Sequence, residues 1–299
     1  MTSTSLHPLR LVRPVGLAHL TMLEVSPPDL VVAAAEAGYD AVGLRVCPGG
    51  PGEQPWFPAG PAGRRTVAQT RRRLDDTGLE LLDVDIVPIR PGTRVADLLP
   101  ALDLAADLGA SLAIAFVEDE DASRAADTTA EVASAAAERG LRLLVEAMAY
   151  KAVRTLDRAV ALAEGSPGAG VVVDPLQLHR CGDGVDDVRA LDASLVPLVQ
   201  VCDAPLVQPA GFPATGPLPR GQAAGTVVGQ LEARAWRLPA GEGELPLAEL
   251  LAVLPDAALS IEAPNLALSR THEPAALARL HLEALRRVLL GAGDLSMRT

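Results

Sequence analysis

The sequence predicts a single (β/α)8 barrel, the TIM-barrel fold of the α/β class, for a chain of 299 residues. Eight short apolar runs alternate with longer segments of helical periodicity. Most of these runs are continuously apolar, which is typical of parallel strands that are covered on both faces. The competing fold is a doubly wound open sheet, but no GxGxxG turn follows the first run, and this counts against it. We therefore expect one domain over residues 1–299, with about 12 N-terminal and about 5 C-terminal residues peripheral.

The predicted strands recur along the chain at intervals that leave room for helices between them. A hydrophobic content of 49% is sufficient for a core that surrounds such a sheet. In chain order, the strands are expected at residues 16–21, 41–46, 80–87, 112–117, 141–147, 170–174, 196–203 and 259–263.

The helices between the strands are predicted from their first and last residues. Ser26, followed by two prolines and Asp29, is typical of a helix start. There a serine side chain can cap the backbone, and the helix dipole stabilises an acidic side chain. We expect this helix to end at Gly38 and two later helices to end at Gly109 and Gly140. Glycine is common at these positions because it readily adopts a left-handed conformation.

Two connections that follow strands are longer than the others. Residues 47–63 follow the second strand and hold Trp56, and residues 204–244 follow the seventh strand and hold Trp236. Loops of this kind lie at the C-terminal face of a barrel, where substrates bind. We expect these loops to form a lid or the walls of a pocket; the alternatives are subunit contacts and solvent-facing insertions.

Charge and composition exclude several classes of function. The formal net charge of −12 would repel a nucleic-acid backbone. No apolar run reaches the roughly 18 residues that a membrane span requires, and the N-terminal residues do not resemble a secretory signal. Cys47, Cys181 and Cys202 form no CxxC pair, which argues against a disulfide framework and a thiolate zinc site. We expect a cytoplasmic protein with a small-molecule substrate, no nucleic-acid partner and no membrane partner.

Four polar residues stand at the ends of the last four predicted strands: Glu146, Asp174, Gln200 and Glu262. A barrel enzyme takes its catalytic groups from these ends. Three buried carboxylates at one mouth would repel one another unless a cation or shared protons compensated for their charge. Carboxylate and amide oxygens suit Mn²⁺ or Mg²⁺ better than a structural zinc ion. The alternative for each acid alone is that it caps the helix that follows.

Several segments of the chain are similar to those of a known family in their order and spacing. They are LTMLEVSPPDLVVAAAEAGYDAVGLRV near the N-terminus and then LVEAMAYKAVRTLDRAVAL, VVVDPLQLHRCG, VQVCDAP, RLPAGEGELPL and LSIEAP. With these segments, the chain resembles the sugar phosphate isomerases and epimerases of the xylose isomerase-like TIM-barrel superfamily over nearly its whole length. A homo-oligomer is an expectation that comes from this resemblance alone.

The resemblance implies a divalent metal ion held by Glu146, Asp174, Gln200 and Glu262. The ion would be Mn²⁺ or Mg²⁺, with Co²⁺ or Zn²⁺ as alternatives. The resemblance also implies that Glu146 and Glu262 are the acid and base that move a proton at the carbon beside a carbonyl. Relatives often carry histidine where Gln200 and Gln177 stand. At position 200, a glutamine is a neutral and weaker metal ligand than a histidine. At position 177, where the histidine of relatives commonly orients the substrate, His179 is the nearest histidine that could take its place.

Five residues are candidates for binding the substrate: Gln177, His179, Arg237, Arg45 and His19. Relatives often carry a substrate-contacting arginine at the place of Arg237, but an exposed arginine paired with Glu242 or Glu244 is an equal alternative. Arg45 ends the second strand, where it could bind a phosphate or carboxylate group. His19, on the first strand, is either a base or a buried structural histidine.

These residues lead to three hypotheses about function. The first is a divalent-metal-dependent isomerase or epimerase of carbohydrate metabolism, acting through an enediolate on a small polyhydroxylated keto compound such as a sugar, a sugar phosphate or a cyclic polyol. The second is a metal-dependent lyase or dehydratase on a related keto-polyol, because the same intermediate can expel a hydroxyl group. The third is a non-catalytic binding barrel, which the two glutamines at positions 177 and 200 motivate.

Overall fold

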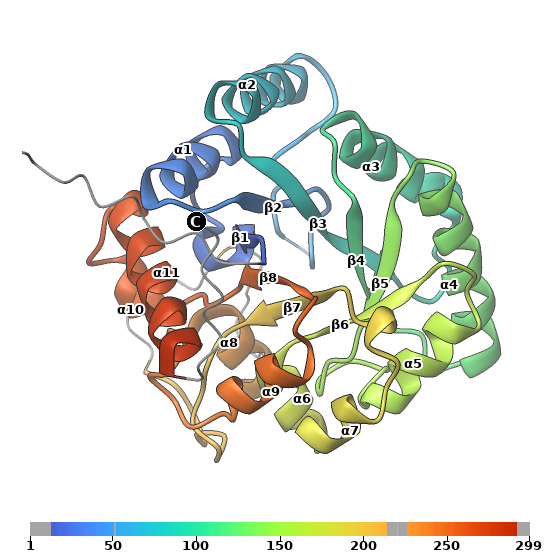
Figure 1. Cartoon of the computed structure of the whole chain (residues 1–299). Coiled ribbons are helices and arrows are strands. Elements are labelled where there is room, and N and C mark those ends of the chain that lie inside the picture. The colour runs from blue at the N-terminus through green and yellow to red at the C-terminus, as the bar shows by residue number, and fades with distance from the viewer. Residues whose placement is uncertain (1–12, 51, 214–219, 221–225, 292–299) are drawn as a thin grey trace, which may run out of the picture.

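The eight strands close into a parallel barrel in which neighbours in the chain pair with each other and β8 pairs with β1 (Figure 1). The computed structural model describes residues 13–50, 52–213, 220 and 226–291. The predicted (β/α)8 barrel is therefore confirmed. The terminal segments that the sequence marks as peripheral lie outside the described residues.

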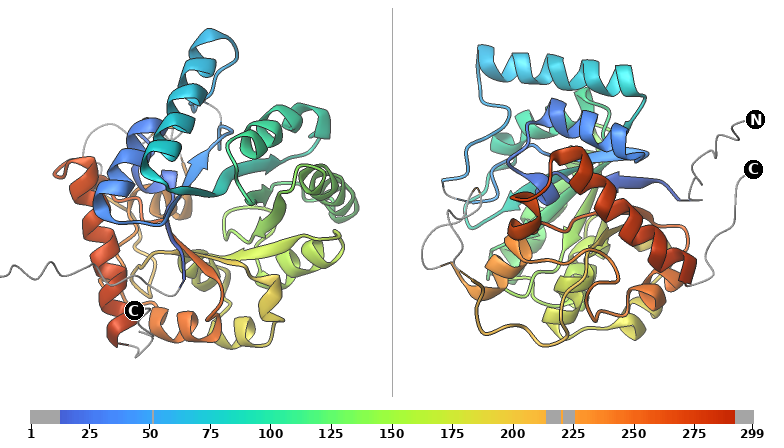
Figure 2. Two further views of the ribbon diagram at one scale, coloured as in Figure 1. Left: turned by 45° about the horizontal axis from the view of Figure 1, so that its top comes forward. Right: turned by 90° about the vertical axis from the view of Figure 1, so that its left-hand side faces the viewer.

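Helices surround the strands on the outside of the barrel (Figures 1 and 2). The strands are β1 (Val15–Leu17), β2 (Ala41–Arg45), β3 (Glu80–Ile89), β4 (Leu112–Val117), β5 (Arg142–Glu146), β6 (Gly170–Val173), β7 (Leu198–Val201) and β8 (Ala258–Ile261). The α-helices are α1 (Pro27–Ala37), α2 (Pro61–Thr77), α3 (Val95–Asp107), α4 (Ala122–Ala137), α5 (Leu156–Glu164), α6 (Pro175–Cys181), α7 (Val185–Arg189), α8 (Val228–Ala235), α9 (Leu247–Val253), α10 (Leu266–Ser269) and α11 (Pro274–Gly291). Two 3₁₀ helices are η1 (His19–Met22) and η2 (Ala193–Leu195).

The inside of the barrel changes from apolar to polar along the strands. Leu144, Val172 and Leu198 belong to one buried cluster that draws its members from strands alone, so the cluster lies inside the barrel. Side chains two residues apart lie on the same face of a strand. Two residues after these three apolar side chains stand Glu146, Asp174 and Gln200. The sequence therefore directs these polar groups toward the axis at the C-terminal ends of β5, β6 and β7.

A glycine in β2 makes room for a carboxyl group inside the barrel. A Cβ atom on Gly43 would lie 2.4 Å from Oδ1 of Asp83 in β3. Asp83 is 1% exposed, and its Oδ2 accepts a hydrogen bond from Oγ of Ser260 at 3.3 Å. Burial first, and then the charge of Asp85, raises the pKa of Asp83 to about 7. Glycine at position 43 thus allows an acid that is costly to ionise to fit inside the barrel.

The predicted helix ends are confirmed at the glycines but not in one detail at a helix start. Gly38, Gly109 and Gly140 have positive φ angles of 91°, 88° and 74°. Ser26 occupies the N-cap position of α1, but its side chain makes no capping hydrogen bond. Its hydroxyl group instead donates to Oδ2 of Asp29 at 2.5 Å. Ser26 is therefore the N-cap residue that the sequence predicts, but its side chain bonds to the acid of the first turn and not to the backbone.

The first strand is shorter than the sequence predicts. Strand β1 ends at Leu17, and the remainder of the apolar run forms η1. Thr21 explains this turn, because its Oγ1 donates to the carbonyl oxygen of Ile261 at 2.8 Å and accepts from the backbone N–H of Ala263 at 3.1 Å. These two bonds fasten η1 across the end of β8 instead of letting β1 continue.

The long connections after β2 and β7 contact each other. Oε2 of Glu53, after β2, pairs with Nη2 of Arg234, in α8, at 2.8 Å. The guanidinium group of Arg220 lies 4.3 Å from the ring centre of Trp56. The second tryptophan, Trp236, stacks instead on Phe212, with 5.6 Å between the ring centres. The two loops therefore meet at the C-terminal face of the barrel.

Two predictions from composition concern membranes and disulfides. In the described part of the chain, no helix is long and apolar enough to cross a membrane. Cys47, Cys181 and Cys202 are all free thiols, as the sequence predicts. Cys202 is buried beside the polar centre of the barrel, with its Sγ 3.6 Å from Oδ1 of Asp174.

Candidate active site

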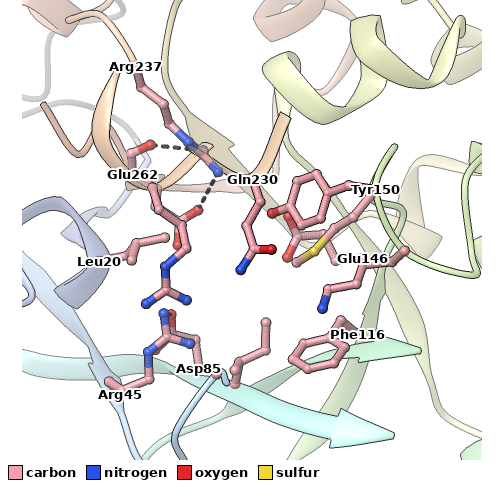
Figure 3. A pocket seen from close by; sticks show the side chains of 14 residues that line it. Leu20, Arg45, Asp85, Phe116, Glu146, Tyr150, Gln230, Arg237 and Glu262 are labelled. Atoms are coloured by element: carbon pink, nitrogen blue, oxygen red, sulfur yellow. Dashed lines mark hydrogen bonds and ion pairs between the residues drawn. The ribbon is translucent and has the colours of Figure 1, made fainter. Parts of the chain in front are cut away.

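A small pocket lies at the C-terminal ends of the strands (Figure 3). Four residues of the predicted site line it: Arg45, Glu146, Arg237 and Glu262. In Figure 3, Arg237 and Glu262 lie at one end of the pocket, and Arg45 and Asp85 lie at the other. The pocket thus has two ends of different composition.

Glu146 is the last residue of β5 and places a carboxyl group in the pocket. The residue is 2% exposed, and its Oε1 has no hydrogen-bond partner among the described residues. Burial is the largest cause that raises the pKa of Glu146 well above its ordinary value of 4.5, and the charge of Glu262 is the next. The group therefore favours the protonated form.

Glu262 follows β8 and lines the same pocket. Its Oε1 accepts a hydrogen bond from Nε2 of Gln200 at 2.9 Å, and its Oε2 pairs with Nη2 of Arg237 at 3.2 Å. Burial raises the pKa of Glu262 to about 8, although Arg237 beside it acts in the opposite direction. Gln200 orients this carboxylate through its amide nitrogen, and its own Oε1 lacks a partner in the described structure.

Arg237 connects the buried acids. The residue is 1% exposed, its Nε donates to the carbonyl oxygen of Ala233 at 2.7 Å, and its Nη1 donates to the carbonyl oxygen of Glu262 at 3.0 Å. Nη1 also forms an ion pair with Oδ2 of Asp174. The alternative of an exposed arginine is therefore wrong, because this guanidinium is the cation that two buried carboxylates require.

Asp174 has two partners at once. It is the N-cap residue of α6, and its Oδ1 accepts from the backbone N–H of Gln177 at 3.1 Å. Its Oδ2 pairs with Arg237. The helix-capping alternative for the strand-end acids thus holds for Asp174, but it accounts for one of its two oxygens.

The other three predicted substrate-binding residues do not line the pocket. The Oε1 of Gln177 accepts from the backbone N–H of Ala149 at 3.3 Å, so this side chain supports the loop after β5. Nε2 of His179 lies 2.9 Å from the carbonyl oxygen of Leu206. His19 is fully buried, and its Nδ1 accepts from the backbone N–H of Arg45 at 3.2 Å.

Burial lowers the pKa of His19 to about 3, so this imidazole is neutral. Its Nε2 therefore donates to the carbonyl oxygen of Val25, which lies 2.9 Å away, because Nδ1 already accepts a hydrogen bond. Its ring stacks on Trp56, with 5.9 Å between the ring centres. These contacts match the structural alternative for His19 that the sequence left open.

Five further lining residues with polar or charged side chains were not candidates from the sequence: Asp85, Tyr150, Lys151, Gln230 and Arg234. Asp85 had a signal, since an acid within the apolar run of β3 must find a polar place inside the barrel. The others lie in the connection after β5 or in α8, where sequence periodicity does not say which side chains turn inward. Figure 3 shows the side chain of Gln230 pointing into the pocket, with Glu262 on one side and Glu146 on the other.

The donor set at the buried acids fits a divalent cation in its chemistry. Three carboxyl groups lie near one arginine, which pairs with two of them, so ionising all three would leave an excess of negative charge. Oε1 of Glu146 and Oε1 of Gln200 are buried oxygens without a hydrogen-bond partner in the described structure. Among the described residues, no three Asp, Glu, His or Cys side chains already surround one point as metal ligands do. Two of the acids, Asp174 and Glu262, instead pair with Arg237.

Comparison with solved structures finds several proteins with the same architecture. The IolI protein with a bound zinc atom has a TM-score of 0.71 and 15% identity, covering 95% of this chain and 100% of its own. A D-allulose 3-epimerase from Methylomonas sp., in complex with D-allulose, has a TM-score of 0.63 and 17% identity over 94% of this chain and 98% of its own. Identities this low show a shared fold.

A fusion of a xylose isomerase-like TIM barrel with 4-hydroxyphenylpyruvate dioxygenase gives a TM-score of 0.72 and 20% identity over 94% of this chain. The chain spans 43% of that fusion protein, so the likeness concerns a part of it. No curated protein matches the chain significantly. The family model for the xylose isomerase-like TIM barrel matches residues 31–288. The chain therefore belongs to the xylose isomerase-like TIM-barrel family.

Proposed function

We propose that the protein is a divalent-metal-dependent isomerase or epimerase that moves a proton at the carbon beside the carbonyl of a small polyhydroxylated keto compound. The observation that carries this proposal is that two buried carboxyl groups, those of Glu146 and Glu262, line one small pocket. Moving a proton away from a carbon atom and returning it requires a base and an acid that both reach that carbon.

Burial raises the pKa of both glutamates, but their partners differ. Glu146 has no cationic partner at hydrogen-bond distance among the described residues. Glu262 is held by Arg237 and Gln200, which make it the easier of the two to ionise. We therefore assign Glu262 as the base that removes the proton and Glu146 as the partner that returns one; a glutamate that holds the ion is ionised. A general base works best when its pKa lies near the working pH.

Arg237 and Gln200 position the base rather than exchange protons themselves. A guanidinium group does not lose its proton in a protein, and an amide does not titrate. Both donate to Glu262, through Nη2 and Nε2 respectively, and so fix the orientation of its carboxylate. Asp174 in turn holds the guanidinium group.

A divalent ion would be held by the predicted set of Glu146, Asp174, Gln200 and Glu262. Such an ion would polarise the carbonyl and offset the negative charge that develops on its oxygen. The two buried oxygens without hydrogen-bond partners, on Glu146 and Gln200, support this assignment. Oxygen donors favour Mn²⁺ or Mg²⁺. The ion competes with Arg237 for the carboxylates that this arginine now holds.

The activity is tested by incubating the protein with keto sugars, their phosphates and cyclic keto-polyols in the presence of Mn²⁺, and by recording product masses and NMR spectra. A new isomer of unchanged mass supports the proposal. A product that has lost water would instead assign the chain to the lyases. No conversion of any compound would contradict the proposal.

The metal is tested on protein prepared without a histidine tag. We expect about one equivalent of Mn²⁺ per chain by calorimetric titration, in line with a single mononuclear site. Asp174→Ala should lose this binding. Asp183→Ala is the matched control, because Asp183 caps a nearby backbone N–H of α5 but lies outside the ligand set. Equal binding by wild type and Asp174→Ala would contradict the assignment.

A further inference from the structure

The end of the pocket away from Arg237 holds two arginines from different parts of the chain. Arg45 is the last residue of β2, and Arg234 belongs to α8, within the long connection after β7. Both line the pocket, and their side chains are 4% and 8% exposed. Guanidinium groups carry their charge at every relevant pH, so two of them so deeply buried need acceptors for their protons.

The acceptors that the protein supplies do not use all of these protons. The guanidinium group of Arg45 makes no hydrogen bond within the described structure and has ion pairs at 3.4 Å to Oε1 of Glu53 and Oδ2 of Asp85. Arg234 donates from Nη2 to Oε2 of Glu53 and to the carbonyl oxygen of Arg220. The Nε atoms of both arginines are buried without a hydrogen-bond partner among the described residues, although Nε of Arg45 is the atom that pairs with Glu53 at 3.4 Å.

The two guanidinium groups converge beside a glycine. A Cβ atom on Gly49 would lie 3.0 Å from Nη1 of Arg234 and 3.3 Å from Nη1 of Arg45. Two cations held at one place repel each other, and the bridge through Glu53 offsets one of their two charges. A side chain at position 49 would crowd both groups, each of which would have to shift by a few tenths of an ångström. Glycine at position 49 thus leaves space beside both guanidinium groups.

The remaining charge of this cluster is small. Two arginines and Glu53 leave one positive charge, and Asp85, which lies at the same 3.4 Å from Arg45 as Glu53, offsets this charge only when it is ionised. Burial also raises the pKa of Asp85, which opposes its ionisation. A ligand group with one negative charge would neutralise the cluster, whereas a doubly charged group would leave an excess of negative charge in a buried place.

We propose that Arg45 and Arg234 bind a carboxylate group of the substrate, so that the substrate is a hydroxylated keto acid. This inference rests on the proposed function, because it takes Glu146 and Glu262 as the reacting end of the same pocket. In Figure 3, Arg45 lies below Arg237 and Glu262, and the side chain of Gln230 points into the pocket with Glu262 on one side and Glu146 on the other. A substrate that spans the pocket would hold its carboxylate at the arginines and its keto group at the glutamates. Glu53 positions the two arginines and does not touch the ligand.

The inference is tested by calorimetric titration of the metal-loaded protein with three ketohexoses that differ at one terminal carbon. The compounds are D-fructose, D-fructuronate and D-fructose 6-phosphate, which carry there a hydroxymethyl group, a carboxylate and a phosphate. We expect D-fructuronate to bind about 10-fold or more tightly than D-fructose, which is the usual effect of a charge-assisted hydrogen bond. Equal binding of the two would overturn the inference, and tighter binding of the phosphate would overturn the choice of a carboxylate.

Variants locate the effect. Arg234→Gln should weaken D-fructuronate binding by about 10- to 100-fold and leave D-fructose binding within about 3-fold. Arg180→Gln is the matched control, because Arg180 has the same 8% side-chain exposure and the same 2.8 Å pair with a buried glutamate, Glu232, but does not line the pocket. Circular dichroism checks that both variants fold. An equal loss in the two variants would overturn the inference.

A separate readout distinguishes this inference from the proposed function. Exchange of substrate protons with deuterated water is followed by NMR for D-fructuronate in the same samples. Binding that depends on Arg234 without any proton exchange would support the carboxylate site and contradict the proposed chemistry. Proton exchange on D-fructose as fast as on D-fructuronate, with no loss in Arg234→Gln, would support the chemistry and overturn the carboxylate site.

Discussion

Replacing Asp83 with asparagine should remove a loss of folding stability that occurs as the pH rises. Burial raises the pKa of Asp83 from an ordinary value of 3.8 to about 7, and the residue is 1% exposed. An acid whose pKa is higher in the folded state favours folding fully below its unfolded pKa, and this contribution is lost as the pH rises through the folded pKa. At about 1.4 kcal/mol per pKa unit, the loss between pH 4 and pH 8 is about 4 kcal/mol.

The asparagine has the same size, can still accept from Ser260 and cannot ionise. We therefore expect Asp83→Asn and wild type to have similar free energies of unfolding at pH 4, and the variant to be more stable by up to about 4 kcal/mol at pH 8. Urea denaturation at several pH values measures this difference. Asp127→Asn, at an exposed position in α4, is the control and should show no such trend. A difference that does not grow with pH would refute the reasoning.

Three further predictions concern the candidate site. Arg237→Gln should lower the free energy of unfolding by about 3–5 kcal/mol in urea denaturation, because two buried carboxylates lose their cation. Adding Asp174→Asn to this variant should restore part of the lost stability. A loss below about 1 kcal/mol in Arg237→Gln would contradict the pairing. Gln177→Leu should cost about 1–3 kcal/mol by the same assay, since the backbone N–H of Ala149 loses its acceptor, without changing Mn²⁺ affinity. Gln200→His should tighten Mn²⁺ binding in calorimetric titration, because imidazole is a stronger ligand than an amide; unchanged or weaker binding would speak against position 200 as a ligand.

The fold could be predicted because each strand carries its own signal. Buried parallel strands require continuous apolar runs, and the run from Leu112 to Val117 coincides with β4. Strand β1 was predicted too long because an apolar run does not show where tertiary hydrogen bonds stop it. Here Thr21 bonds across to the end of β8, a partner more than 200 residues away in the chain.

The reacting end of the site could be predicted for a related reason. Glu146 stands two residues after Leu144 in β5, and Gln200 two residues after Leu198 in β7. Each strand that buries its leucine therefore also fixes the direction of the polar side chain. Arg237 could not be assigned from the sequence, because an arginine in a long connection reads the same whether it is exposed or buried. The structure decides this through its partners, Asp174 and Glu262.

The other end of the pocket depends on how loops fold back. Arg234 reaches the pocket because α8 packs beside the loop after β2, where Glu53 holds it. Gln177 was expected to bind the substrate. Instead it supports the backbone after β5, because its Oε1 accepts a hydrogen bond from the backbone N–H of Ala149. Such contacts join residues far apart in the chain, and local patterns carry no information about them.

The central claim is that Glu146 and Glu262 exchange protons with a carbon atom of the substrate. It is tested most directly by measuring deuterium incorporation from heavy water beside the substrate carbonyl, with wild type, Glu146→Gln and Glu262→Gln, all loaded with Mn²⁺ and checked for folding. We expect each variant to lower the overall exchange rate by about 100-fold or more, the usual contribution of a general acid or base. Exchange at the wild-type rate in either folded variant would contradict the account.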